Sequence, residues 1–187
     1  MSQIGMSQSE LHNELPMYEM SQYKEHYNPG NVISRMVEGL GYRYYWATEE
    51  LTPEDLAFKP SEDARDAFST IEHLYGLSTT ILNTAKNKAN IRPSNFSGWS
   101  FDQLRASTLS NLEEASQLFQ DKSAEEISEL KIIFESNGNK SEYPFWNLIN
   151  GPIADAIYHT GQIVSFRRSS GNPMDPNVNV FIGKNKE

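Results

Sequence analysis

Apolar side chains recur at steps of three and four residues along four stretches of roughly twenty residues each, and this pattern constrains the fold more than any other feature of the sequence. The spacing is that of one face of an α-helix. It predicts helices over residues 29–49, 67–88, 100–120 and 144–169. Helices of this length bury their apolar faces against one another. The sequence therefore predicts an all-α protein, built as a four-helix bundle.

Capping residues mark the ends of the predicted helices. Asn28 and Pro29 suit the start of the first helix, and Ser100 with Gln103 has the form of a capping box. Gly151-Pro152 interrupts the last helix, so that helix is either kinked there or begins there.

Between the third and fourth helices the pattern changes. Residues 130–136 alternate weakly and lead into Asn137-Gly138, a dipeptide typical of tight turns. This predicts a small hairpin before the last helix. Residues 90–99 contain Pro93 and Gly98, and we interpret them as a loop.

The chain divides into three parts. Residues 1–27 form a polar lead segment without a clear period, residues 28–170 hold the bundle, and residues 171–187 form a C-terminal tail. The tail contains Val178, Val180 and Phe181, which predicts that it packs on the bundle.

Composition excludes several classes of protein. Sixteen basic and twenty-five acidic residues give a net charge of −9, which disfavours binding to nucleic acid or to an anionic membrane surface. The absence of cysteine excludes disulfides, cysteine zinc sites and a cysteine nucleophile. No stretch is apolar enough to span a bilayer, and the first 27 residues lack the apolar core of a signal peptide. We therefore expect a cytoplasmic protein.

Two histidines lie in the middle of predicted helices, and they are the best candidates for chemistry. His159 follows Asp155 by four residues, so both side chains share one helix face. A third ligand from another helix would complete a divalent metal site, and His73 is the other mid-helix histidine. The alternative is a hydrogen-bonded surface pair of Asp155 and His159. Arg167 and Arg168 have a simpler interpretation, as the solvated last turn of the fourth helix.

Two segments of the sequence resemble the DinB-like (YfiT-like) superfamily of four-helix metal proteins. The first is Ile-Glu-His-Leu at residues 71–74, which is similar to the second helix of that family. The second is residues 153–163, which resemble the fourth helix, where the family usually has His-x-x-x-His followed by x-Gly-Gln-Ile. With residues 51–56, which fit the opening of the family, the likeness covers about residues 28–168.

The resemblance implies a set of metal ligands. The family holds a divalent metal, commonly nickel or zinc, with three histidines. His73 matches the first of these and His159 the last, but Asp155 stands where the family has its middle histidine. Two histidines and one carboxylate also suit iron(II) or manganese, and they occur at catalytic zinc sites. The same exchange is compatible with a degenerate site.

The resemblance also implies an activity. Some relatives are thiol-dependent S-transferases and others are described as metal-dependent hydrolases, so the expected ligand is a small-molecule substrate or a thiol. Gln162 and Tyr158 would lie beside the metal, and Glu72 is a nearby carboxylate. The alternative is a non-catalytic stress-response or ligand-binding bundle.

Aromatic residues between 42 and 46 bear on association. They provide more aromatic surface than one helix stripe buries, and relatives are often dimers, so we expect a homodimer. The alternative is that these rings pack against the lead segment or the tail. The four residues are Tyr42, Tyr44, Tyr45 and Trp46.

Overall fold

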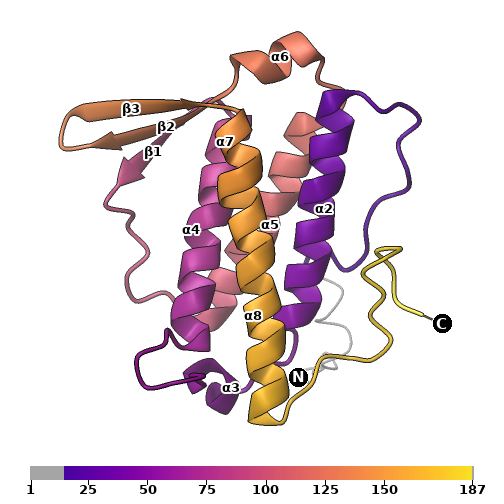
Figure 1. Ribbon diagram of the computed structural model, residues 1–187, viewed down its shortest axis with the longest axis vertical. Helices are drawn as coiled ribbons and strands as arrows, with labels where there is room; N and C mark the ends of the chain where they lie inside the picture. The colour runs from indigo at the N-terminus through magenta and orange to yellow at the C-terminus, as the bar shows by residue number, and fades with distance from the viewer. Residues whose placement is uncertain (1–14, 187) are drawn as a thin grey trace, which may run out of the picture.

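A computed structural model describes residues 15–186 of the chain. The first fourteen residues of the predicted lead segment, His12 among them, lie outside the described part. Four long helices form the body of the molecule (Figure 1). They are α2 (Pro29–Thr48), α4 (Ala67–Ala85), α5 (Phe101–Phe119) and α8 (Ala154–Ser170). The short helices α3 (Pro53–Ala57), α6 (Ala124–Glu129) and α7 (Trp146–Leu148) lie at the ends of the body.

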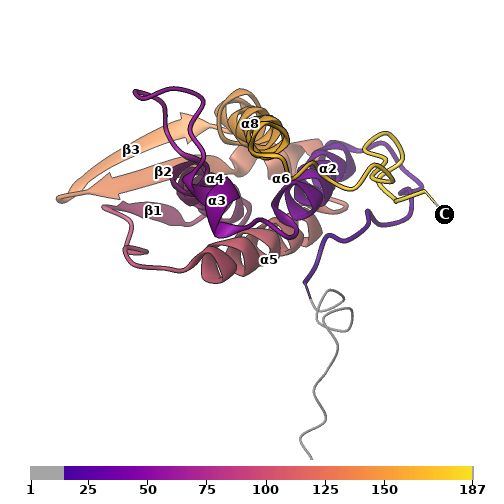
Figure 2. The same ribbon diagram turned by 90° about the horizontal axis from the view of Figure 1, so that it is seen from below.

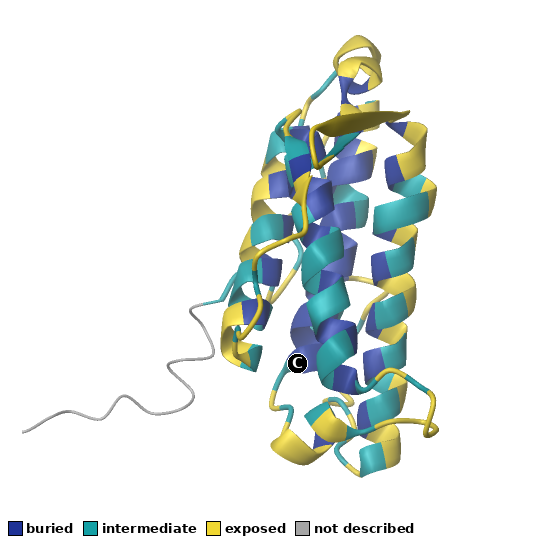
Figure 3. Ribbon diagram, turned by 90° about the vertical axis from the view of Figure 1, so that its left-hand side faces the viewer, coloured by how far each residue is buried: buried dark blue, intermediate teal, exposed yellow. Residues whose placement is uncertain are grey.

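The four long helices do not alternate in direction. α2 and α8 run one way, whereas α4 and α5 run the other way and are joined by a long return connection (Figure 1). Seen end-on, α5 and α8 lie on opposite sides of the pair α2 and α4 (Figure 2). Buried residues face the space between the helices, and the outer faces are exposed (Figure 3). Within residues 15–186, no helix is both long and apolar enough to cross a membrane.

The prediction of an all-α protein is wrong. Three strands form a mixed sheet at one end of the helices, in the order β1 (Ala89–Arg92), β2 (Lys131–Ser136) and β3 (Asn139–Pro144). The expected hairpin is present, since β2 and β3 pair antiparallel around Asn137-Gly138. The unexpected strand is β1, which pairs parallel to β2 within the segment that we interpreted as a loop.

The burial of β1 explains why its sequence gave no strand signal. Asn90 is buried and the neighbouring Ile91 is 62 % exposed, the reverse of an ordinary amphipathic strand. The Asn90 amide donates a hydrogen bond to the Ile133 carbonyl (3.0 Å) and accepts one from Asn83 (3.0 Å). A buried asparagine satisfied in this way is stable, but a pattern of four residues does not reveal it.

The last predicted helix is broken at the expected dipeptide. Residues Ile149–Ile153 form a π-helical turn that contains Pro152, and Gly151 has non-helical backbone angles. Proline cannot donate the backbone hydrogen bond that a regular helix requires at this point. The break separates α7 from α8, so α8 starts at Ala154.

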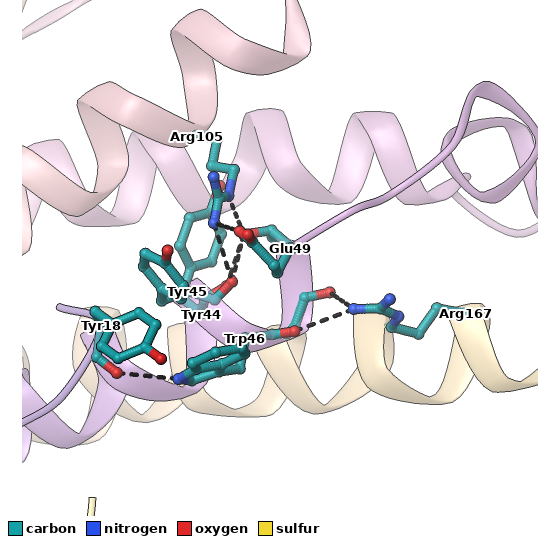
Figure 4. A network of polar contacts seen from close by, with 9 residues as sticks. Tyr18, Tyr44, Tyr45, Trp46, Glu49, Arg105 and Arg167 are labelled. Atoms are coloured by element: carbon teal, nitrogen blue, oxygen red, sulfur yellow. Dashed lines mark hydrogen bonds and ion pairs between the residues drawn. The ribbon is translucent and has the colours of Figure 1, made fainter. Parts of the chain in front are cut away.

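The aromatic residues that suggested a homodimer are buried inside one chain. Tyr42, Tyr44 and Tyr45 are at most 1 % exposed, and Trp46 is 8 % exposed. Trp46 donates a hydrogen bond from its indole nitrogen to the Tyr18 carbonyl (3.0 Å), as drawn in Figure 4. Residues 15–27 and the described part of the tail cover this face of α2, so the rings no longer argue for a dimer.

Two arginines hold the C-terminal end of α2, and Figure 4 shows both. Arg105 of α5 pairs with Glu49, and its guanidinium lies 4.8 Å from the centre of the Tyr45 ring. Arg167 donates to the carbonyl oxygens of Trp46 (3.0 Å) and Ala47 (3.3 Å). Arg167 is only 3 % exposed, so the prediction that it lies in a solvated helix end is wrong. It satisfies carbonyls that the end of α2 leaves without intrahelical partners.

Candidate metal centre

His73 is positioned by the start of α4. The carboxylate of Asp66 accepts a hydrogen bond from the Ser69 backbone nitrogen (2.7 Å) and caps the helix. Burial alone raises the pKa of Asp66, but hydrogen bonds from Ser69 outweigh burial and lower it, so the cap is ionised. His73 follows the cap by two helical turns and lies about 10 Å along α4 from its first residue.

Asp155 and His159 are positioned by the break before α8. Because the π-helical turn ends at Ile153, both residues fall in the first two turns of α8. Their spacing of four residues places them on one helix face, where His159 Nε2 lies 3.3 Å from Asp155 Oδ1.

The packing of α4 against α8 brings the three predicted ligands together. One ligand atom from each of His73, Asp155 and His159 lies within 4.8 Å of the others. His73 Nε2 is 3.1 Å from Asp155 Oδ2, so each oxygen of the carboxylate faces one histidine. The two imidazole rings meet edge to face, with centroids 4.7 Å apart. The three side chains meet partway along the helices, between α4 and α8.

Two of these separations are close to those found around a divalent cation. With ligand bonds of 2.0–2.2 Å, the donor atoms around a tetrahedral ion lie about 3.5 Å apart, and those around an octahedral ion about 3.0 Å apart. The two nitrogen–oxygen separations, 3.1 and 3.3 Å, fall in that range, but each uses a different oxygen of Asp155. One donor atom from each of the three residues lies within 4.8 Å of the others, so the side chains would have to draw closer around an ion. The exposed fractions are 36 % for the His73 side chain, 42 % for Asp155 and 15 % for His159, so the group is open on one side. This group could hold a metal ion with coordination positions left for solvent or substrate.

Gln162 sets the orientation of the His159 ring. Its Oε1 lies 2.7 Å from His159 Nδ1, and an amide oxygen can only accept, so Nδ1 donates. In the neutral ring, Nε2 then keeps a lone pair, which faces the Asp155 carboxylate. The Nε2 lone pair and the carboxylate oxygen are both hydrogen-bond acceptors, and they repel each other unless a cation lies between them or a second proton is added to the ring. Gln162 is thus the partner that a metal-binding histidine ordinarily has on its other nitrogen.

Tyr158 lies at the edge of the group. Its ring is 5.2 Å from the His159 ring, and its hydroxyl accepts a hydrogen bond from Gln162 Nε2 (3.3 Å). Since Tyr158 is 64 % exposed, it contributes to the rim of the site and to the support of Gln162.

A cavity of about 700 Å³ adjoins the group and includes His73 in its wall. One side of the cavity is α4, from Glu72 to Asn83, and the other is residues 89–96. Glu72 could be named from the sequence, whereas Arg92 and the rest of this second wall could not. No signal in the sequence reveals that wall, because the return connection that forms it has no helical period.

No family model, curated protein or solved structure matches this chain.

Proposed function

We propose that this chain is a DinB-like metalloprotein that binds one divalent cation through His73, Asp155 and His159 and acts as a metal-dependent hydrolase or thiol S-transferase. The observation that carries the proposal is the convergence of one donor atom from each of these residues within 4.8 Å. The expected ions are zinc, nickel, iron(II) and manganese, since all accept imidazole and carboxylate ligands.

A cation at this position supplies Lewis-acid chemistry, which polarises a carbonyl group and lowers the pKa of a bound water or thiol. The residues of the chain supply the rest. Gln162 holds His159 in the tautomer that presents Nε2 to the site. Asp155 brings a negative charge between the two imidazoles. Glu72 lines the adjoining cavity and is the carboxylate placed to accept a proton from a substrate bound there.

Calorimetric titration of metal-free, folded protein with each of the four ions tests the proposal. We expect one site per chain, with affinity that falls as the pH is lowered, because protons compete with the metal for the two imidazoles. His159→Ala should abolish binding, and Asp155→His should preserve it by supplying a nitrogen donor in place of the carboxylate. His26→Ala is the matched control, since the His26 side chain is 75 % exposed and outside the group.

Cobalt(II) substitution distinguishes the two reaction classes. A charge-transfer band on addition of a thiol shows that the metal accepts the thiolate that a transferase requires, and metal-dependent ester or amide cleavage without a thiol supports the hydrolase. If none of the four ions binds at neutral pH, the proposal fails and a non-catalytic bundle remains.

A further inference from the structure

The cavity beside the metal group is elongated along α4. The chain passes from α4 into β1 of the sheet, and residues 93–99 then run back towards the other end of α4, where α5 begins (Figure 1). Tyr75 meets Phe96 edge to face at 5.2 Å, close in sequence to His73, whereas Asn83 bonds to Asn90 near the other end of the helix. At about 700 Å³, the cavity has the volume of sites that hold small organic molecules.

Arg92 lines this cavity at a distance from His73. It follows Asn90 by two residues in β1, so both side chains lie on the same face of the strand. Asn90 contacts Asn83, which follows His73 by ten residues, or about 15 Å along α4, so β1 and Arg92 meet α4 near the end away from His73.

The guanidinium of Arg92 is held in place but has no acidic partner. It lies over the Phe134 ring, 4.4 Å from its centre. Among residues 15–186, no carboxylate lies within ion-pair distance of it. Stacking on a ring occupies the face of a guanidinium and leaves the N–H groups at its edge available.

The charges along the cavity differ between its two ends. At the His73 end, Asp155 would offset part of the positive charge of a divalent ion held by the metal group, and Glu72 is the one acidic residue among the described residues in the wall of the cavity. At the other end the positive charge of Arg92 is not offset. An anionic group of a ligand is therefore favoured at Arg92, with the opposite end of the ligand at the metal.

We propose that the cavity binds an elongated small-molecule substrate that carries a carboxylate at the end remote from the metal, and that Arg92 pairs with this carboxylate. This inference rests on the proposed metal-dependent function and names its substrate class. A single guanidinium fork matches a planar carboxylate in charge and geometry. A phosphate dianion ordinarily requires further cations or a helix N-terminus, and the lining residues include no second lysine or arginine. The ring pair of Tyr75 and Phe96 gives the cavity an apolar wall close to His73.

Two hydroxamates of equal chain length test this assignment on the metal-loaded protein. Suberic acid monohydroxamate and octanohydroxamate share the metal-binding group and the methylene chain, but only the first ends in a carboxylate. We expect the first to bind about tenfold more tightly, which is the effect of a charge-assisted hydrogen-bonded pair that is partly exposed. Arg92→Gln should remove this preference and leave octanohydroxamate binding unchanged. Arg168→Gln is the matched control, since Arg168 is exposed in the last turn of α8 and outside the cavity.

The outcomes separate this inference from the proposed function. Equal binding of the two hydroxamates by the wild type, or a preference that survives Arg92→Gln, overturns the inference and leaves the metal site intact. Stronger competition by inorganic phosphate than by acetate against suberic acid monohydroxamate contradicts the choice of a carboxylate. Failure to bind any metal ion removes the proposed function, and this inference with it.

Discussion

At the scale of single residues, Gln162 is the side chain whose replacement separates a metal ligand from a simple ion pair. Its Oε1 lies 2.7 Å from His159 Nδ1. Partners of this kind fix the ring and make it a better ligand, and their loss typically lowers metal affinity by about 10–100-fold. Gln162→Leu should therefore weaken metal binding at least about tenfold. Gln162→Glu, which keeps an oxygen acceptor, should retain the affinity.

Calorimetry of the two Gln162 variants at neutral pH measures this effect. Gln162 is partly exposed, so neither substitution should change the thermal unfolding temperature of the metal-free protein by more than a few degrees. A leucine variant that binds metal as tightly as the wild type would show that Gln162 does not support the ligand.

The sequence predicted the candidate site residues better than it predicted their surroundings. The four-residue spacing of Asp155 and His159 placed them on one face, and this follows from helix geometry alone. His73 could be predicted as the third ligand because it is the other histidine in the middle of a predicted helix. The position of Arg92 depends on a return connection and a parallel strand pair, which are long-range contacts. Local patterns carry no information about contacts of this kind.

At the scale of secondary-structure elements, Asp55 joins α3 to the end of α8. Its carboxylate accepts hydrogen bonds from the Thr52 backbone and hydroxyl (both 2.8 Å), from Asn172 (2.7 Å) and from Ser170. Burial alone raises the pKa of Asp55, but these hydrogen bonds outweigh burial and lower it to about 2 from its usual 3.8. The ionised form is thus the one that the folded state stabilises.

The depressed pKa of Asp55 predicts an acid-sensitive contribution to stability. The contribution is fully present above about pH 4 and is lost as the pH falls from there towards about 2. A shift of this size corresponds to roughly 2 kcal/mol at neutral pH. Asp55→Asn should cost at least about that much at pH 7 and remove this part of the acid dependence. Urea unfolding at pH 7 and pH 3 measures both effects.

Asp63→Asn provides the control for Asp55. Asp63 is exposed in the connection between α3 and α4, so its replacement should leave the unfolding midpoint unchanged. An Asp55→Asn variant as stable as the wild type at pH 7 would contradict the role assigned to these hydrogen bonds.

The long helices were predictable because each has a repeating apolar face and a capping residue. Predicted and observed ends agree within three residues for α2, α4 and α5. The short helix α6 was missed although Ser123 and Glu126 form a capping box, because six residues are too few to establish a period. The sheet was incompletely predicted for a related reason. Its hairpin has a local turn signal, whereas β1 depends on a parallel partner more than forty residues later in the chain.

At the scale of the whole molecule, residues 15–27 and the described part of the C-terminal tail complete the burial of α2. The Met20 backbone nitrogen donates to the Gly183 carbonyl (2.8 Å), which links the two segments directly. Figure 2 shows both beside α2, on the side away from α4. A helix as aromatic as α2 would otherwise expose much of its surface, so these segments belong to the folded unit.

Deletion of residues 175–187 tests this dependence. Tyr42 is fully buried; its hydroxyl donates to Asn185 Oδ1 (2.6 Å) and accepts from the Asn179 backbone nitrogen (3.2 Å). Loss of two hydrogen bonds and exposure of the ring should cost about 2–4 kcal/mol. For a chain of this length, that lowers the melting temperature by roughly 5–10 °C. Phe181→Ala is the control. Because the Phe181 side chain is 93 % exposed, this variant should have the melting temperature of the wild type. Metal affinity should persist in the truncated chain, since the metal group lies between α4 and α8. A truncated chain with the melting temperature of the wild type would show that the tail adds nothing to the stability of the core.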